Sequence, residues 1–236
     1  MQRNIRLILL ALILTFACSQ LAWAAFPTIS NKENKSSRPR FDIYTPQLSG
    51  ARSGDAQSVI NKSLNAVSEK MLADYRQATN YIYQESRDSE RNANLMKALV
   101  LIVNYDVKLL NQNTFSIVQQ GYMYSGGAHG MTTTIAKTFN LDTGREYKLA
   151  DLFDNEDYER EISAIIRKEI VNRDKQNVYR FTGLQNNQAF FITKEGLFIY
   201  FQQYEIAPYS EGIITFFIPY SSLSGFKSEI IYGKIQ

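Results

Sequence analysis

Two segments of the chain place apolar residues at three- and four-residue steps, the spacing of one face of an α-helix. The first opens at Gly54-Asp55 and runs to about Glu85, with Asp55 as the expected N-cap. The second covers residues 157–172 and sets an apolar stripe against a charged face. The stripe positions are Val59, Ile60, Leu64, Val67, Met71, Leu72 and Tyr75 in the first segment and Tyr158, Ile162, Ile165, Ile166 and Ile170 in the second. We therefore predict one long helix and one shorter amphipathic helix.

Around these segments the pattern changes to short runs of β-branched and aromatic residues, which predict strands. The runs cover residues 40–48, 97–109, 115–122, 132–141, 189–193, 197–201 and 213–218. The run 98–103 is apolar enough for a strand buried on both faces. Turn residues at 111–113, 142–144 and 194–196 favour antiparallel neighbours. The order of elements predicts an α+β fold with antiparallel sheets, a long helix in the first half and a second helix packed on a C-terminal antiparallel sheet.

Residues 1–25 have the form of a signal peptide. Arg3 and Arg6 are followed by an apolar stretch at 7–17 and by the small-residue cleavage pattern at 22–24. The apolar stretch is too short to predict a membrane span. We expect export to the periplasm or the cell exterior, with no stable membrane span after cleavage.

Cys18 is the only cysteine of the chain and lies inside the predicted signal. The alternatives to cleavage after Ala24 are an uncleaved N-terminal anchor and a lipid anchor on Cys18. Cleavage leaves an exported chain without cysteine, which excludes disulfides, thiolate catalysis and cysteine metal sites.

Residues 26–40 combine Pro, Ser, Asn, Lys and Arg with little periodicity, which predicts a flexible leader after the signal. Beyond the leader we expect two α+β subdomains, the first over residues 41–125 and the second over residues 126–236.

The charges of the chain are nearly balanced. There are 26 Lys and Arg against 23 Asp and Glu, and Arg3 and Arg6 fall within the predicted signal. An exported part so close to neutral gives no reason to expect a nucleic acid or an anionic membrane as partner. The 15 Tyr and 14 Phe suit half-buried sheets and also protein contact surfaces.

The run 122–130 interrupts the strand pattern with three glycines and holds His129, the only histidine. As a general base His129 would need a nucleophile and an orienting acid, for which Ser125 and Asp142 are the available residues. The structural alternative is a loop histidine that locks a turn shaped by Gly126 and Gly127. These two glycines lack the Lys-Ser/Thr that follows in a phosphate loop, so nucleotide binding is not expected.

Tyr204, Pro208 and Tyr209 lie in a second aromatic loop. Tyrosines beside a rigid proline suit contact with a protein or a sugar, and the alternative is that they cover the edge of the core. Glu205 with Glu211 could serve glycoside cleavage, as could the acidic cluster at 151–157, although acids at a helix start more often act as caps. That cluster, Asp151, Asp154, Glu156 and Asp157, lacks the order of a calcium loop, and we predict no metal site and no cofactor.

Six short motifs stand in a characteristic order. They are Tyr124-Ser125-Gly126-Gly127-Ala128-His129, Asn140-Leu141-Asp142-Thr143-Gly144, Leu149-Ala150-Asp151-Leu152-Phe153, Phe191-Ile192-Thr193-Lys194-Glu195-Gly196-Leu197, Tyr204-Glu205-Ile206-Ala207-Pro208-Tyr209 and Ile218-Pro219-Tyr220. In this order the chain resembles the RsiV-like extracytoplasmic region, a pair of domains of largely unknown function, over roughly residues 40–233. The resemblance implies a two-part α+β fold. In the name-giving member, an anti-sigma factor, the region binds lysozyme, and a related N-terminal half precedes the catalytic domain of a peptidoglycan deacetylase.

Only six residues precede the apolar stretch and no deacetylase domain follows residue 236, so we expect neither sigma-factor regulation nor deacetylation. The expected function is a non-enzymatic, exported binding module of the cell envelope. Its partner is expected to be a lysozyme-like muramidase, held by the loops Ser125–Gly130 and Tyr204–Glu211. The near-neutral charge offers no electrostatic complement to a basic lysozyme. The alternatives are a peptidoglycan- or glycan-binding module and, with less support, a hydrolase that uses His129.

Overall fold

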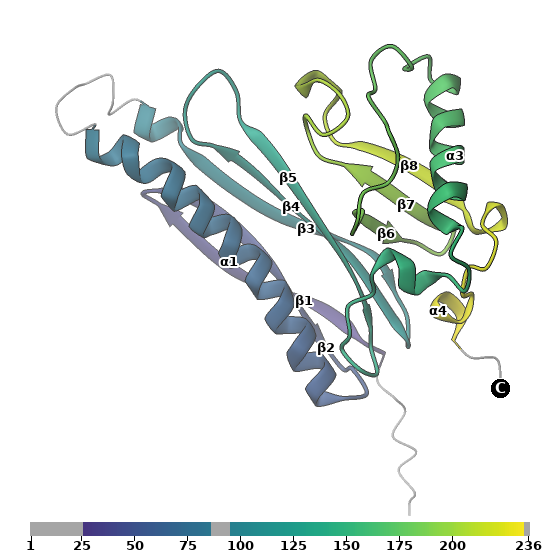
Figure 1. Cartoon of the computed structure of the whole chain (residues 1–236). Coiled ribbons are helices and arrows are strands. Elements are labelled where there is room, and N and C mark those ends of the chain that lie inside the picture. Colours follow the sequence, from purple (N-terminus) through teal and green to yellow (C-terminus); the bar gives the residue numbers. More distant parts are fainter. Residues whose placement is uncertain (1–25, 86–94, 234–236) are drawn as a thin grey trace, which may run out of the picture.

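The computed structural model describes residues 26–85 and 95–233, so the predicted signal peptide and Cys18 lie outside the described residues. Two modules lie side by side (Figure 1). The first contains β1 (Thr28–Ser37), β2 (Arg40–Ser49), α1 (Gly54–Glu85), β3 (Val100–Leu110), β4 (Thr114–Tyr124) and β5 (Met131–Asn140). The second contains the 3-10 turn η2 (Leu149–Leu152), α3 (Tyr158–Asn172), β6 (Phe190–Ile192), β7 (Gly196–Phe201), η3 (Tyr209–Glu211), β8 (Ile214–Pro219), η4 (Tyr220–Ser222) and α4 (Glu229–Tyr232). The predicted α+β class is confirmed.

The long helix α1 lies along one face of a five-stranded sheet with the order β1-β2-β3-β4-β5 (Figure 1). Its apolar stripe is buried except at Val59, which is 53% exposed, and Ile60 and Leu64 are completely inaccessible to solvent. The prediction that Val59 belongs to the buried stripe is wrong. Ser53 caps the start of the helix from the residue before it, because its hydroxyl accepts the backbone N–H of Ala56 at 3.1 Å. The predicted cap at Asp55 is therefore wrong, because the helix starts one residue earlier, at Gly54.

The five-stranded sheet is mixed, which corrects the prediction of purely antiparallel sheets. Strands β2 and β3 run parallel, with Phe41 opposite Leu101, because α1 carries the chain back to the end of the sheet where β2 began. The other pairs are antiparallel, including the predicted meander β3-β4-β5. The prediction that the run 98–103 is a strand buried on both faces is also wrong, since Leu101 and Val103 pack under α1 while Val100 and Ile102 on the opposite face are only half-buried and Ala98 is exposed.

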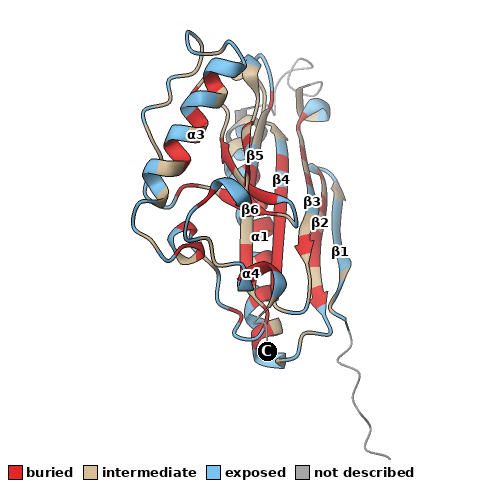
Figure 2. Ribbon diagram, turned by 90° about the vertical axis from the view of Figure 1, so that its right-hand side faces the viewer, coloured by how far each residue is buried: buried red, intermediate tan, exposed pale blue. Residues whose placement is uncertain are grey.

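Residues 26–40 form no flexible leader, because they contain the edge strand β1. All ten of its residues pair with β2, from Thr28 opposite Ser49 to Ser37 opposite Arg40. Nearly every side chain of β1 is exposed, and Figure 2 shows the strand in pale blue at the rim of the sheet. A strand exposed on both faces needs no apolar residues, which is why its polar composition resembles that of a disordered segment.

The second module is a three-stranded antiparallel sheet, β6-β7-β8, with α3 on one face. Ile162, Ile166 and Ile170 of α3 are buried against Ile199 and Phe216 of the sheet. The predicted amphipathic helix and its packing on a C-terminal antiparallel sheet are confirmed. The other face of this sheet, including Phe191, Phe198 and Tyr200, lies against the five-stranded sheet.

The boundary between the modules falls after β5, because β5 is the last strand of the first sheet. The expected boundary between residues 125 and 126 lies instead in the connection between β4 and β5. The two sheets meet through an apolar cluster that includes Val118 and through polar contacts. The backbone N–H of Ile192 donates to the Ser116 hydroxyl at 3.1 Å, and the Thr114 hydroxyl donates to the carbonyl of Ile230 at 2.6 Å.

Candidate functional site

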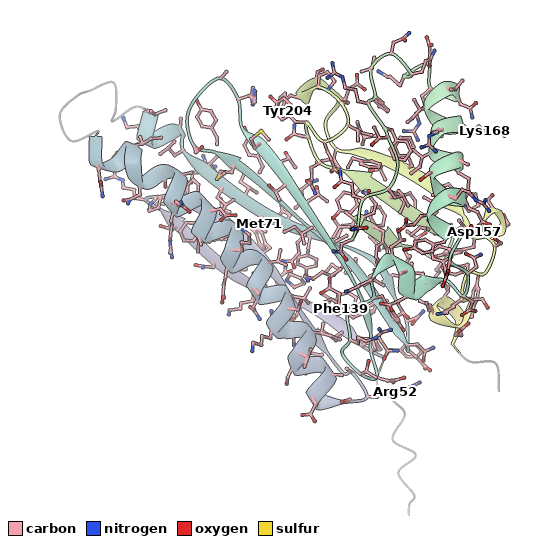
Figure 3. The ribbon with its side chains drawn as sticks, viewed as in Figure 1. Arg52, Met71, Phe139, Asp157, Lys168 and Tyr204 are labelled. Carbon is pink, nitrogen blue, oxygen red and sulfur yellow. The ribbon has the colours of Figure 1, made fainter. Side chains whose placement is uncertain are left out.

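The residues that the sequence predicts for partner binding lie on two loops, one from each module. The β4–β5 loop and the loop between β7 and η3 come together at one end of the molecule, the end at which Figure 3 labels Tyr204. We call this region the contact surface and define it as Ser125, Gly126, Gly127, His129, Tyr204, Pro208 and Tyr209. The structure brings together loops that lie about eighty residues apart in the sequence, while the binding role of these residues stays a prediction.

Glycines give the β4–β5 loop its shape. Gly126 and Gly127 have φ angles of 100° and 96°, a region that other residues rarely adopt. The Tyr124 hydroxyl donates to the carbonyl of Gly127 at 2.9 Å and closes the loop. A Cβ atom on Gly126 would lie 3.3 Å from Cδ1 of Ile82 on α1, so the loop rests closely on the helix. The loop is therefore a fixed turn, and Ser125 beside it is half-buried.

His129 connects the two loops. Its ring stacks on the ring of Tyr209, with centroids 3.9 Å apart and an angle of 21° between the planes. Its Nε2 atom lies 3.4 Å from the Tyr204 hydroxyl, and its Nδ1 atom lies 3.1 Å from the carbonyl of Gly130. The Tyr209 hydroxyl donates to that same carbonyl at 2.8 Å. His129 thus takes part in the junction between the modules.

Tyr204 is an exposed part of this junction. Its side chain is 57% accessible, and its ring centroid lies 5.7 Å from that of Tyr209. Its φ angle is 67°, which costs a non-glycine residue about 1–2 kcal/mol. The turn is supported by Glu205, whose carboxylate accepts the backbone N–H of Gln202 at 2.6 Å. The left-handed turn at Tyr204 thus places a large aromatic side chain in solvent.

Pro208 lies at the edge of a cleft next to Tyr204. The cleft has a volume of about 580 Å³, and its walls include Arg180, Glu205 and Ile206. Pro208 directly precedes the short helix η3, where its fixed φ favours the start of a helical turn. A ligand that covers Tyr204 would therefore find an adjoining hollow with one positive and one negative side chain.

The loop that carries Tyr204 is fastened to the free edge of β5 by two glutamines. The Gln203 side-chain oxygen accepts the N–H of Thr132 at 2.8 Å. Gln202 accepts the N–H of Thr134 at 3.1 Å and donates to the carbonyl of the same residue at 2.6 Å. These side chains occupy the positions of a sixth strand, so the edge of the sheet is covered where the contact surface begins.

Tyr200 also covers the edge of β5, next to the two glutamines. Its hydroxyl accepts the N–H of Ala136 at 2.9 Å and lies 3.2 Å from the carbonyl of Thr134, to which it donates. Burial disfavours the phenolate and raises the pKa of Tyr200 to about 12. The roles of Tyr200, Gln202 and Gln203 were not predicted from the sequence, although Gln202 and Gln203 are two polar residues that directly follow an apolar strand.

The residues considered for catalysis are not assembled into a catalytic site. Within the described residues Ser125 makes no hydrogen bond to His129, whose two nitrogens face Gly130 and Tyr204. Asp142 pairs with Arg52 at 3.6 Å, at the opposite end of the molecule, where Figure 3 labels Arg52. The geometry gives no support to a triad of Ser125, His129 and Asp142.

The candidate carboxylates have structural partners. Glu211 accepts hydrogen bonds from Lys175 at 3.0 Å and from the Tyr179 hydroxyl at 3.1 Å, and the bond with Lys175 lowers the pKa of Glu211. Asp151 accepts the N–H of Lys148 at 2.7 Å at the start of η2. In residues 26–85 and 95–233 no group of three or more His, Cys, Asp or Glu side chains could hold a metal ion.

Asp154 and Asp157 of the acidic cluster also form ion pairs, with Lys227 at 3.3 Å and with Arg160 at 3.0 Å. The cluster therefore has structural roles, with Asp151 as a cap at η2 and Asp154 and Asp157 in ion pairs, although Asp157 makes no side-chain cap hydrogen bond at the start of α3.

The two-module architecture has relatives of known family. A family model described as "Deacetylase PdaC" matches residues 30–132, and one described as "Protein of unknown function (DUF3298)" matches residues 150–221. These ranges correspond to the two modules. The chain therefore carries a PdaC-type region followed by a DUF3298 region, the paired arrangement that the sequence resemblance predicted.

Individual relatives support this assignment. The chain is 27% identical over 158 residues to the peptidoglycan-N-acetylmuramic acid deacetylase PdaC of Bacillus subtilis (strain 168), a match that spans 63% of this chain and 32% of that protein. A DUF3298 family member from Bacteroides fragilis NCTC 9343 has the same fold, with a TM-score of 0.66, 18% identity, and coverage of 88% of this chain and 95% of the other. A second DUF3298 family protein, from Pseudomonas aeruginosa PAO1, gives a TM-score of 0.55 at 14% identity, with 87% and 95% coverage.

None of the helices in the described part of the chain combines the length and apolar character needed to cross a membrane.

Proposed function

We propose that this protein is an exported, non-enzymatic binding protein of the cell envelope. Its contact surface would hold a protein partner, for which a lysozyme-like muramidase is the best candidate. The observation that carries the proposal is the stack of His129 on Tyr209, which joins the loops of both modules and leaves Tyr204 exposed beside them. Export rests on the form of residues 1–25 and agrees with a relative named for a cell-wall substrate.

The contact surface has the physical properties of a protein-binding site. Tyrosine anchors contribute large contact areas and lose little conformational freedom on binding. Tyr204 is held by a strained backbone and lies close to Tyr209, so a partner would find an ordered aromatic pair. Preorganisation of this kind improves affinity because fewer side chains become immobilised on binding.

Electrostatic attraction is expected to contribute little to this binding. The exported part is close to neutral, and the exposed Glu205 already accepts a backbone hydrogen bond from Gln202. Affinity for a basic muramidase would then come from shape and from burial of Tyr204. We therefore expect the affinity to change little between about 50 and 300 mM salt. The binding of electrostatically steered complexes weakens over the same range.

The test is a binding measurement with purified protein and lysozymes of several classes, by biolayer interferometry. Tyr204→Ala should weaken binding at least about tenfold, since a buried aromatic anchor contributes about 2 kcal/mol or more. Tyr232→Ala is the matched control, because Tyr232 is 72% exposed at the opposite end of the protein. The absence of binding to every lysozyme class at micromolar concentration would count decisively against this partner.

A glycan is the second candidate ligand for the same surface. The cleft of about 580 Å³ beside Tyr204, with Arg180 and Glu205 in its walls, favours it. Co-sedimentation with purified cell walls, compared for the natural protein and Tyr209→Ala, separates the two. If the ligand is a sugar, purified cell walls would retain this protein without any other protein present. If the partner is a muramidase, binding would not require cell walls. A hydrolase using His129 has the least support, and activity that survives His129→Ala would eliminate it.

A further inference from the structure

A second pocket lies at the other end of the molecule, where the modules meet again. Its volume is about 690 Å³, within the range of about 300–1,000 Å³ typical of small-molecule sites. Its walls come from the segment before α1, the β3–β4 turn, the segment after β5 and the C-terminal helix α4. We call it the junction pocket. Figure 3 labels Arg52, one of its lining residues, far from Tyr204 and the contact surface.

The walls of the junction pocket are fixed by hydrogen bonds between the modules. The Asn111 side chain donates to the carbonyl of Ile231 at 2.7 Å, and the Thr114 hydroxyl donates to the carbonyl of Ile230 at 2.6 Å. Gly233 follows α4 with a φ of 76°, and a Cβ atom there would lie 2.4 Å from Nδ2 of Asn113. The backbone of Gly233 therefore packs directly on Asn113, and the pocket exists before any ligand arrives.

The charged side chains around the junction pocket are mostly paired with each other. Arg145 lies 3.1 Å from Asp151, and Arg52 lies 3.6 Å from Asp142. Lys227 lies 3.3 Å from Asp154, just outside the lining. Internal pairing leaves no excess of positive charge to hold a phosphate or another strong anion. The pocket instead suits a ligand without net charge.

Other polar groups in the pocket remain available for hydrogen bonds. In the described part of the chain the Asn113 side chain has no hydrogen-bond partner, and the Glu229 carboxylate has none either. Gln112 accepts from Arg52 at 2.9 Å through its oxygen and keeps its amide N–H groups. An amide, a carboxylate and further amide donors can together bind several hydroxyl groups.

Tyr232 adds an aromatic surface to this polar set. Its side chain is 72% exposed at the mouth of the pocket, whereas the ring of Tyr147 is covered by the Arg145 guanidinium, 5.4 Å from the centroid. The apolar face of a sugar ring packs well on an exposed tyrosine, because C–H groups leave water while the hydroxyl groups point outward. We propose that the junction pocket binds a short neutral oligosaccharide, with its hydroxyl groups on Asn113 and Glu229 and one ring on Tyr232.

This site is independent of the contact surface, so the two proposals can fail separately. The full chain, produced with its export signal and purified, would be titrated with an N-acetylglucosamine tetramer by isothermal calorimetry. The expected Kd is on the order of 0.1–1 mM, since the pocket is open and offers one aromatic platform. Tyr232→Ala and Asn113→Ala should each weaken binding at least about fivefold, while Tyr232→Phe retains it because the ring remains.

Val171→Ala is the control and should leave tetramer binding unchanged, because Val171 is an exposed residue of α3 that lines neither this pocket nor the cleft beside Tyr204. Tyr204→Ala distinguishes the two surfaces, since a tetramer held at the contact surface would be lost in that variant. Thermal unfolding of each variant shows whether it is folded, and Glu229→Gln provides a further variant at an exposed position. Three results would overturn the proposal: no heat at 10 mM tetramer, equal binding by Tyr232→Ala, or loss of binding in Tyr204→Ala. Binding of inorganic phosphate in preference to the tetramer would also overturn it.

Discussion

Gln202 bonds both backbone groups of Thr134 on the edge of β5, accepting the N–H at 3.1 Å and donating to the carbonyl at 2.6 Å. A single side chain from the second module thus pairs with the first module as a neighbouring strand would. The same segment of chain continues into Tyr204, two residues further on. The segment that covers the edge of β5 therefore also places Tyr204 in the contact surface.

Gln202→Ala should destabilise the protein without changing its fold. The substitution leaves the N–H of Thr134 unpaired in a residue that is 5% exposed, and the carbonyl of Thr134 keeps only the Tyr200 hydroxyl as a donor. We expect a loss of about 1–3 kcal/mol in the free energy of unfolding, the usual cost of unsatisfied buried backbone groups. Urea denaturation measures it. Gln176→Ala is the control, since Gln176 bonds only Asp174 on the surface, and an equal loss in both variants would contradict the role of Gln202.

The main elements of the fold could be predicted because burial leaves a periodic pattern in the sequence. Ile60 and Leu64 repeat at helical spacing and are both fully buried. Strand β1 leaves no such pattern, since Lys32 and Lys35 are exposed and only its backbone holds it to β2. The parallel pairing of β2 with β3 likewise leaves no pattern in the sequence, because it depends on the end of the sheet at which the long helix α1 places the start of β3.

The candidate site could be predicted only as two separate loops. Glycines next to the single histidine identify the first loop, and Tyr204 with Tyr209 identifies the second. The stack of His129 on Tyr209 joins residues eighty positions apart, and a local sequence pattern cannot predict a contact between residues so far apart in the chain. Gln202 was missed for the same reason, because its partner Thr134 lies in the other module.

Gly144→Ala should destabilise the turn after β5. Gly144 has a φ of 73°, and an added Cβ atom would lie 3.0 Å from the backbone of Ala56 at the start of α1. Neither the left-handed backbone nor the neighbouring helix can adapt easily, so we expect a loss of about 1–3 kcal/mol. Gly54→Ala is the matched control, because nothing lies within 4 Å of its added Cβ atom. Thermal melts that shift equally for both variants would disprove the argument.

Tyr200→Phe should change how stability depends on alkaline pH. Burial raises the pKa of Tyr200 from 10.0 to about 12, so the folded state favours the neutral phenol. The resulting stability is fully present below pH 10 and is lost as the pH rises toward 12, a change of about 2–3 kcal/mol for a shift of this size. Denaturant unfolding between pH 8 and 12 tests it.

The Tyr200→Phe variant should be about 1–2 kcal/mol less stable at pH 8, because the N–H of Ala136 loses its acceptor. It should then lose less stability than the natural protein above pH 10. Burial also raises the pKa of Tyr220, which both proteins keep, so the difference between the two curves isolates Tyr200. Curves that stay parallel up to pH 12 would contradict the assignment.

His129→Ala should weaken partner binding while the protein remains folded. The change removes the ring that stacks on Tyr209 at 3.9 Å, an interaction of about 0.5–1.5 kcal/mol, and releases the junction between the loops. His129→Phe restores a flat ring without a titratable group, so it should recover most of the binding. Equal loss of binding in both variants would contradict a role that depends on the flat ring. Lysozyme binding by the two variants, compared at one pH with thermal unfolding as the folding control, therefore tests whether the ring of His129 shapes the contact surface by stacking on Tyr209.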